Sequence, residues 1–271
     1  MLFHIFYSIR PSACVMVSIF TVAAFRPEAT EIETAILLFV DAFAGAAFCF
    51  LINDVFDREK DRLNQKSRPI ATGALTVRFA IVAIGFFMLT YLIVSFLLGM
   101  VVFVLAIISL VLFTLYSPVN NRGGFIANIL VAICASGSVW GVAIVRDYEP
   151  TLFYLSLLIF FMILIREILL DWLDISGDKA IGKTSIPILF GAKKTAWFVA
   201  LLLMINTVLV CSAPFMVSIS MLSLIALILA IVITWVAILF LFKNLSERMI
   251  LFNIRFSHVT FVFMVIAILW R

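Results

Sequence analysis

An asparagine and three aspartates fall within nine residues at the end of an apolar run. Residues 53–61 read NDVFDREKD and follow an almost uncharged stretch, 34–52. If the apolar helix continues, Asn53, Asp57 and Asp61 share one face, because each residue turns a helix by about 100°. Such oxygen ligands suit Mg²⁺, which often binds a few carboxylates together with substrate phosphates. A hydrated helix end with local ion pairs explains the segment equally well on its own.

A second group of aspartates repeats this spacing later in the chain. The two sets are Asp54, Asp57, Asp61 and Asp171, Asp174, Asp178, each member of the second lying 117 residues after its counterpart. In both, a lysine with Ser or Thr, then Pro-Ile and a glycine, follow in the same order. We interpret segments 53–73 and 171–191 as an internal repeat, and membrane-protein repeats often place a shared site between the halves.

The two motifs together suggest one chemical device. Carboxylates would hold Mg²⁺, the metal would hold a diphosphate, and the basic loop after each motif would neutralise the remaining charge. Without a cation, six clustered aspartates would repel one another. Carboxylates at membrane depth are costly and usually functional, so two independent hydrated helix ends are the weaker interpretation.

Composition predicts an all-α polytopic membrane protein. The 271 residues are 65% hydrophobic and 13% charged, whereas soluble domains are about 45–50% apolar and ~25% charged. A span needs about 20 apolar residues, and the chain has nine candidates in what reads as a single domain, 1–271. They are 11–26, 33–53, 76–98, 100–117, 124–145, 151–170, 192–212, 216–242 and 254–270. We expect membrane lipid, and no nucleic acid, as a partner.

The basic residues predict the orientation. With the N-terminus in the cytoplasm, 16 of the 19 Lys and Arg fall on that side, and only Arg26, Arg146 and Arg271 fall on the other. Cytoplasmic loops carry the excess of Lys and Arg. We therefore expect a plasma-membrane protein with the N-terminus and both motifs cytoplasmic and the C-terminus outside.

Both motifs resemble signatures of a known family. Residues 53–73, with NDxxDxxxD and then RPIxxG, resemble the first signature of the UbiA-type intramembrane prenyltransferases. Residues 171–187, DxxDxxxDKxxGKTxxP, resemble the second. The likeness extends along most of the chain, since the span count also fits. Residues 166–178 look most similar to the branch of geranylgeranylglyceryl-phosphate geranylgeranyltransferase and chlorophyll synthase.

The resemblance implies an enzyme built as a helical bundle around a central cavity. Its reaction would be Mg²⁺-dependent transfer of a prenyl group from a prenyl diphosphate to a lipophilic acceptor, through an allylic cation. The implied metal ligands are Asn53, Asp57, Asp61, Asp174 and Asp178, the catalytic residues Asp54, Asp171 and Tyr116, and the diphosphate-binding residues Lys66, Arg68, Arg122 and Lys183. Asp54 and Asp171 are either additional metal ligands or supports for them.

Several alternatives stay open at this point. The lysine that usually follows the tyrosine in this family is missing after Tyr116, so a terpene cyclase that needs no acceptor is the second hypothesis. A cation-coupled transporter is a weaker third, because it would need ionisable groups near the midplane, where only Asp41 is well placed. Asp41 could be functional or hydrogen-bonded to a neighbouring helix. Glu167 could extend the second acidic face or pair with Arg166, and Arg10 could be an interfacial anchor.

Overall fold

Apolar helices account for most of the chain. The structure is a computed structural model, and it describes residues 2–63, 67–120, 123–146, 148–180 and 182–271. In these residues it forms twelve α-helices and one 3₁₀ helix, η1. Each of the nine expected spans corresponds to a helix, and seven are long and apolar enough to cross a membrane. The other two, α2 and α6, are shorter apolar helices. The all-α prediction is confirmed, whereas nine crossings and a central cavity stay predictions.

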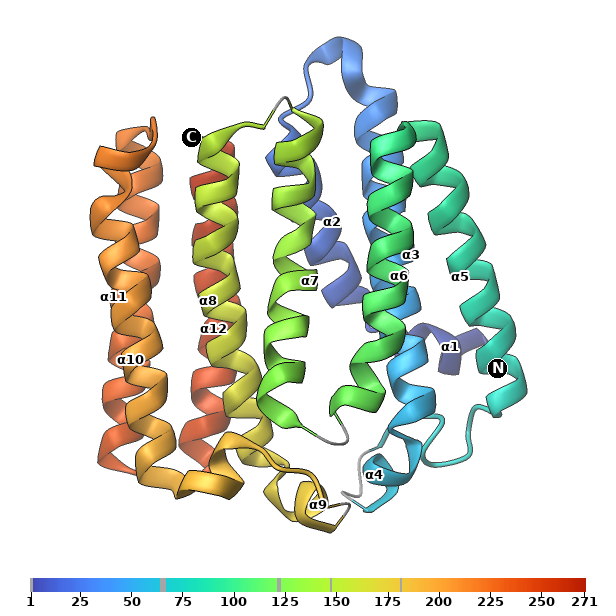
Figure 1. Cartoon of the computed structure of the whole chain (residues 1–271), viewed down its shortest axis with the longest axis vertical. Coiled ribbons are helices and arrows are strands. Elements are labelled where there is room, and N and C mark those ends of the chain that lie inside the picture. The colour runs from blue at the N-terminus through green and yellow to red at the C-terminus, as the bar shows by residue number, and fades with distance from the viewer. Residues whose placement is uncertain (1, 64–66, 121–122, 147, 181) are drawn as a thin grey trace. The chain divides into compact units, whose positions relative to one another are not determined.

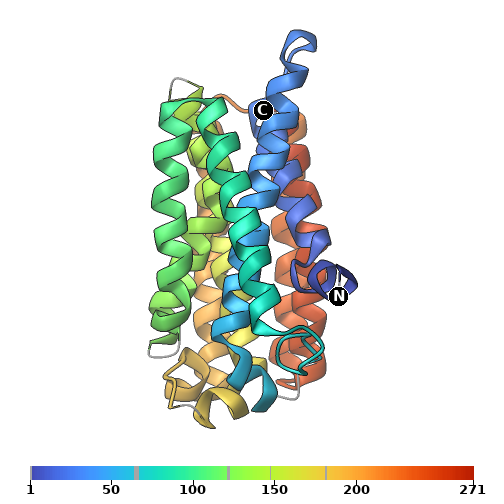
Figure 2. The same cartoon turned by 90° about the vertical axis from the view of Figure 1, so that its right-hand side faces the viewer.

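The chain divides into two compact units, Met1–Asn121 and Arg122–Arg271. The first unit contains α1 (Leu2–Ser8), α2 (Pro11–Phe25), η1 (Ala29–Glu31), α3 (Ile32–Phe56), α4 (Arg58–Leu63), α5 (Val77–Leu98) and α6 (Met100–Asn120). Helix α3 packs against α2, α5 and α6 and is the centre of this unit (Figure 2). A β-carbon at Gly45 of α3 would lie 3.1 Å from the Tyr91 ring of α5, so the glycine permits the close approach.

The second unit is organised around one buried helix. It contains α7 (Gly124–Val145), α8 (Pro150–Leu173), α9 (Ile175–Ala180), α10 (Ile186–Met216), α11 (Met221–Lys243) and α12 (Glu247–Leu269). Helix α8 packs against α7, α10 and α12. Its core side chains include Leu152, Leu155 and Leu158, each at most 1% exposed. The short α9 follows directly, at the end of the unit where α10 begins (Figure 1).

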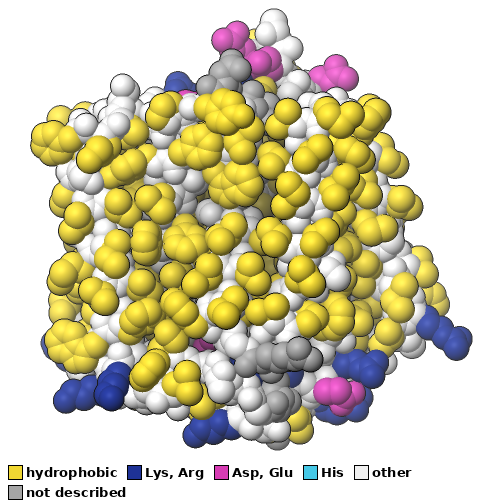
Figure 3. Space-filling view, in the orientation of Figure 1, with side chains coloured by type: hydrophobic (Ala, Val, Ile, Leu, Met, Phe, Trp, Pro, Cys, Tyr) yellow, Lys and Arg dark blue, Asp and Glu magenta, His cyan; other side chains and the backbone are white. Residues whose placement is uncertain are grey.

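The outward faces of the helices are apolar, as lipid contact requires. Large side chains such as Phe86 and Ile93 of α5 and Val208 of α10 are more than half exposed. Hydrophobic side chains cover most of the face seen in Figure 3. No water competes for backbone groups in the bilayer core, so helices that satisfy their own hydrogen bonds are the stable solution.

Two helices run past the expected ends of their spans. Helix α6 continues beyond residue 117 through Pro118 and ends at Asn120. Helix α10 continues beyond residue 212 through Pro214 and ends at Met216. Gly191 has a positive φ of 75°, so the helical backbone is interrupted there and resumes at residue 192, where the span was expected to begin.

Asp41 is hydrogen-bonded to a neighbouring helix, one of the two roles open from the sequence. It is buried in α3, and the Ser95 hydroxyl of α5 lies 2.5 Å from its Oδ1. Ser95 Oγ also lies 2.7 Å from the Tyr91 carbonyl oxygen, and the Tyr91 hydroxyl is 2.9 Å from Ser109 Oγ of α6. This polar chain connects α3, α5 and α6 inside the first unit.

Candidate active site

The first aspartate motif lies where α3 gives way to α4. Helix α3 ends at Phe56, α4 begins at Arg58, and Asp57 stands between them with φ −86° and ψ 4°. Backbone bonding continues across the break, because Asp57 N donates to the Asn53 carbonyl and Asp61 N donates to the Asp57 carbonyl, both at 2.8 Å. The i, i+4, i+8 alignment is therefore kept, although the helix does not run on unbroken. The φ/ψ region of Asp57 is sparsely populated and often holds active-site residues.

The second motif has the same local backbone. Helix α8 ends at Leu173, and Asp174 has φ −94° and ψ 9°. Asp174 N donates to the Leu170 carbonyl at 3.1 Å, and Asp178 N donates to the Asp174 carbonyl at 2.9 Å. The middle aspartate of each motif thus occupies the break between a long helix and a short one. Beyond this shared geometry, the internal repeat stays a prediction.

Two arginines bind the outer aspartates of the first motif, which are its first and last aspartates, Asp54 and Asp61. Arg68 Nη1 lies 2.9 Å from Asp54 Oδ1 and 2.7 Å from Asp61 Oδ2. Arg10 Nη2 lies 2.7 Å from the same Asp54 oxygen. The side chains of Asp54 and Asp61 are at most 2% exposed, and buried carboxylates need such partners. Arg10 is therefore more than an interfacial anchor.

Packing around the motif holds both arginines in place. The segment after Arg68 is packed through a buried hydrophobic cluster of Ile70, Leu75 and Ala80. Val55 of α3 packs against this cluster. Arg10 has a positive φ of 50°, uncommon outside glycine. Its guanidinium lies 4.6 Å from the centre of the Phe50 ring, a distance suited to a cation–π contact.

One lysine binds the outer aspartates of the second motif. Lys183 Nζ lies 2.8 Å from Asp171 Oδ1 and 3.2 Å from Asp178 Oδ2. Asn128 Nδ2 of α7 donates to the other Asp171 oxygen at 2.8 Å. Lys183 and Asp178 have side chains at most 1% exposed. The site in this unit therefore includes a residue from α7 that the motif does not contain.

A glycine at the start of α7 makes room for the Lys183 loop. A β-carbon on Gly124 would lie 2.9 Å from the Thr184 carbonyl oxygen and 3.0 Å from Lys183 Cε. We expect Gly124→Ala to lower the free energy of unfolding by about 1–3 kcal/mol, because a backbone oxygen has little freedom to move away. Thermal unfolding in detergent measures this effect.

The matched control for that variant is Gly141→Ala in the same helix. No atom lies within 4 Å of its added β-carbon, and alanine is the better helix former. Its melting temperature should equal or exceed that of the unmodified protein. Equal melting temperatures for both alanine variants would contradict the packing argument.

The remaining predicted residues are placed less completely. Lys66 and Arg122, predicted to bind diphosphate, lie outside the described residues. Tyr116 lies half-buried near the end of α6. Arg166 Nη1 lies 3.0 Å from Glu167 Oε1, so the local pair that the sequence left open is present. Asn128 was missed as a site residue, although the family pattern has an asparagine some residues after the tyrosine, and Asn128 follows Tyr116 in this way.

The described residues can bind Mg²⁺ if the protein supplies a few carboxylates and the substrate and water supply the remaining ligands. Among them, no three His, Cys, Asp or Glu side chains are grouped as a complete metal site. Mg²⁺, however, usually takes one or two carboxylates and completes its shell with water and substrate phosphates. In each unit two carboxylates already converge on one cationic nitrogen. Oxygen donors of this kind match the metal.

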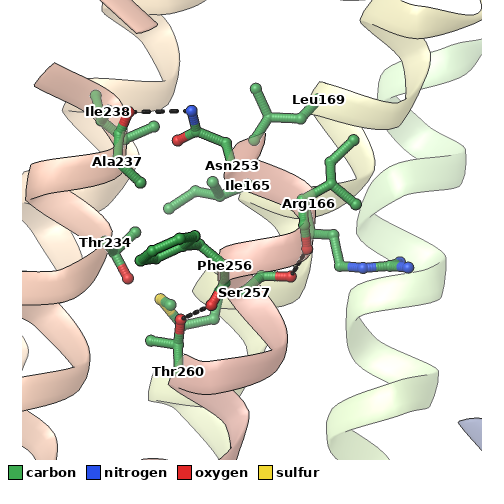
Figure 4. Close-up of a pocket in the computed structure, with 12 residues that line it drawn as sticks. Ile165, Arg166, Leu169, Thr234, Ala237, Ile238, Asn253, Phe256, Ser257 and Thr260 are labelled. Atoms are coloured by element: carbon green, nitrogen blue, oxygen red, sulfur yellow. Dashed lines mark hydrogen bonds between the residues drawn. The ribbon is translucent and has the colours of Figure 1, made fainter. Parts of the chain in front are cut away.

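Two hollows in the second unit are not lined by the motif aspartates. A cavity of about 20 Å³ between α8, α11 and α12 is lined by Thr234, Asn253 and Ser257 among others, and the Arg166 side chain extends away from it (Figure 4). That volume holds about one water molecule, so no prenyl chain fits. A larger hollow of about 390 Å³ is lined by residues that include Trp172 and Lys179 but none of the motif aspartates.

Comparison with known proteins identifies the family. Residues 13–264 match the model of the UbiA prenyltransferase family. A relative from Thermococcus kodakarensis named digeranylgeranylglyceryl phosphate synthase is 32% identical over 202 residues, covering 73% of each chain.

Two solved structures share the fold. A UbiA homologue from Aeropyrum pernix K1 has a TM-score of 0.79 at 15% identity, covering 94% of this chain and 97% of that one. A UbiA homologue from Archaeoglobus fulgidus, solved bound to GPP and Mg²⁺, has a TM-score of 0.72 at 20% identity, covering 98% and 99%. These findings confirm the resemblance seen in the two motifs, and the chain is an integral membrane prenyltransferase that belongs to the UbiA prenyltransferase family.

Proposed function

We propose that the protein transfers a prenyl group from a prenyl diphosphate to the hydroxyl of a prenylated glyceryl phosphate, with Mg²⁺ as cofactor. The observation that carries the proposal is the pair of aspartate motifs with matching backbone breaks at Asp57 and Asp174. The relatives named as digeranylgeranylglyceryl phosphate synthases support the acceptor class. The fold neighbours bound to GPP or DMAPP with Mg²⁺ support the donor and the metal.

Two kinds of side chain are proposed to assist departure of the diphosphate: metal-binding oxygen ligands and basic residues. Asn53, Asp57 and Asp61 in the first unit, and Asp174 and Asp178 in the second, are the proposed metal-binding groups. Bound Mg²⁺ would stabilise the negative charge that develops on the leaving diphosphate. Basic side chains near the motifs add fixed positive charge, which is worth more in a site shielded from water. Both motifs are proposed to be required.

The bond changes balance without any further reagent. The carbon–oxygen bond between the prenyl group and the diphosphate breaks, and the electron pair leaves with the diphosphate. The resulting allylic cation is attacked by the acceptor hydroxyl, which then loses its proton. Aromatic faces can stabilise such a cation, and an apolar helical interior suits the prenyl tail.

An acceptor-dependence assay tests this function. Purified protein is incubated with Mg²⁺ and geranylgeranyl diphosphate, with and without geranylgeranylglyceryl phosphate, and diphosphate release and lipid products are measured. We expect release and an ether-linked product only when the acceptor is present. Release with a cyclic hydrocarbon or alcohol and no acceptor would support the terpene cyclase alternative instead. No release with any donor or acceptor would contradict both.

A further inference from the structure

The two units contain the same arrangement of charge. In each motif, the first and last aspartates bind one cation supplied by the loop that follows. Arg68 joins Asp54 to Asp61 at 2.9 and 2.7 Å. In the second unit a lysine has the same role, with distances of 2.8 and 3.2 Å to Asp171 and Asp178. Two different basic residues at non-equivalent loop positions thus make the same contact.

Burial keeps the Lys183 ammonium group paired with Asp171 and Asp178. The Lys183 side chain is 1% exposed, and the Asp171 and Asp178 side chains are 10% and 0% exposed. Removing one partner of a buried ion pair leaves an uncompensated charge, which is strongly destabilising. Lys183 therefore cannot turn toward a substrate without abandoning two buried carboxylates.

The surrounding backbone favours the same position. Lys183 N donates to the Asp178 carbonyl at 2.9 Å, and the preceding Gly182 has a positive φ of 73°. Gly124 leaves space for the lysine stem, since an added β-carbon would lie 3.0 Å from its Cε. The loop is built to deliver this ammonium group to the two aspartates.

We propose that Lys183, and Arg68 in the first unit, are positioning residues that act as internal counter-ions of the aspartate motifs rather than as diphosphate ligands. This inference rests on the proposed function and deepens it. Carboxylates that bind metals are themselves held by hydrogen bonds, and loss of such a partner typically costs about 10–100-fold in metal affinity or activity. The counter-ions hold the outer carboxylates in place before metal and substrate arrive.

The first test uses thermal unfolding in detergent without metal or substrate. We expect Lys183→Met to lower the melting temperature by about 10 °C, because it breaks a buried charge pair. The double variant Lys183→Met/Asp171→Asn restores the net charge of the three groups and should recover at least half of that loss. Lys194→Met, at an exposed lysine of α10, is the matched control and should change the melting temperature little. A double variant no more stable than the single one would overturn the proposal.

The second test separates positioning from substrate contact. The dissociation constant for geranyl diphosphate is measured calorimetrically at saturating Mg²⁺ in the double variant and in Arg68→Gln. A positioning role predicts values within about threefold of the unmodified protein, with a half-saturating Mg²⁺ concentration about 10–100-fold higher. A direct charge-assisted bond to the diphosphate predicts at least about tenfold weaker binding, and that result would overturn the proposal.

Failure of the proposed function has a different signature. If the unmodified protein neither binds nor turns over prenyl diphosphates, the proposed reaction is wrong. The melting temperatures still decide whether Lys183 is the counter-ion of Asp171, since they need no substrate.

Discussion

We expect Asp57→Asn or Asp174→Asn to lower kcat/KM by about 100- to 1,000-fold, the usual loss when one group that stabilises developing charge is removed. Asp57 and Asp174 occupy the break between a long and a short helix in their motifs. Asparagine keeps the shape and one acceptor oxygen but removes the negative charge that attracts Mg²⁺. Steady-state assays of prenyl diphosphate turnover at several Mg²⁺ concentrations measure the effect.

The control for this pair is Glu59→Gln. Glu59 lies in α4, two residues after Asp57, and its side chain is 64% exposed and paired only loosely with Arg58 and Arg62. Exposed pairs of this kind contribute little, so its kcat/KM should stay within about twofold. Either Asp57→Asn or Asp174→Asn retaining near-normal activity would show that its motif is dispensable and would contradict the proposed two-motif requirement.

Removal of divalent metal should reduce turnover below detection while leaving the protein folded. The activity falls because the diphosphate loses the charge that stabilises its departure. We expect the fold to persist because Arg68 and Lys183 pair directly with the first and last aspartates of the two motifs. We therefore expect EDTA to abolish product formation and to change the melting temperature by only a few degrees.

Metal replacement completes that experiment. Added Mg²⁺ should restore full turnover, whereas Ca²⁺ should restore much less, because it binds oxygens at 2.3–2.6 Å with six to eight ligands instead of a compact octahedron. Undiminished turnover in EDTA would contradict metal dependence. A large fall in melting temperature in EDTA would instead mean that metal, and not the two basic side chains, holds the motifs together.

The arrangement of the first unit also explains a residue whose role the sequence left open. Arg10 was interpretable as an interfacial anchor, yet its guanidinium binds Asp54, 44 residues away. Arg10 has a left-handed backbone (φ 50°) and lies directly before α2 as its N-cap residue. Strain of this kind persists only when surrounding contacts favour it, and the Asp54 and Phe50 contacts are two such contacts.

The sequence by itself determined the helices and the two aspartate motifs, because both depend on residues close together in the chain. The apolar runs specified the helices, because a helix satisfies its own backbone within four residues. The spacing of Asn53, Asp57 and Asp61 specified their shared face for the same reason, and backbone bonds at 2.8 Å preserve it across the helix break. The two motifs, both local, were enough to indicate the family.

Only the tertiary structure decided which charges meet. The contact of Asn128 with Asp171 spans 43 residues, and that of Arg10 with Asp54 spans 44. No helical period encodes such a pair, since it depends on which helices pack side by side and on where each helix ends. The sequence assigned Lys183 to the diphosphate from its place in the basic loop after the second motif and from the family resemblance. Its burial against Asp171 and Asp178 indicates an internal counter-ion, because a charge removed from water is stable only beside its partner.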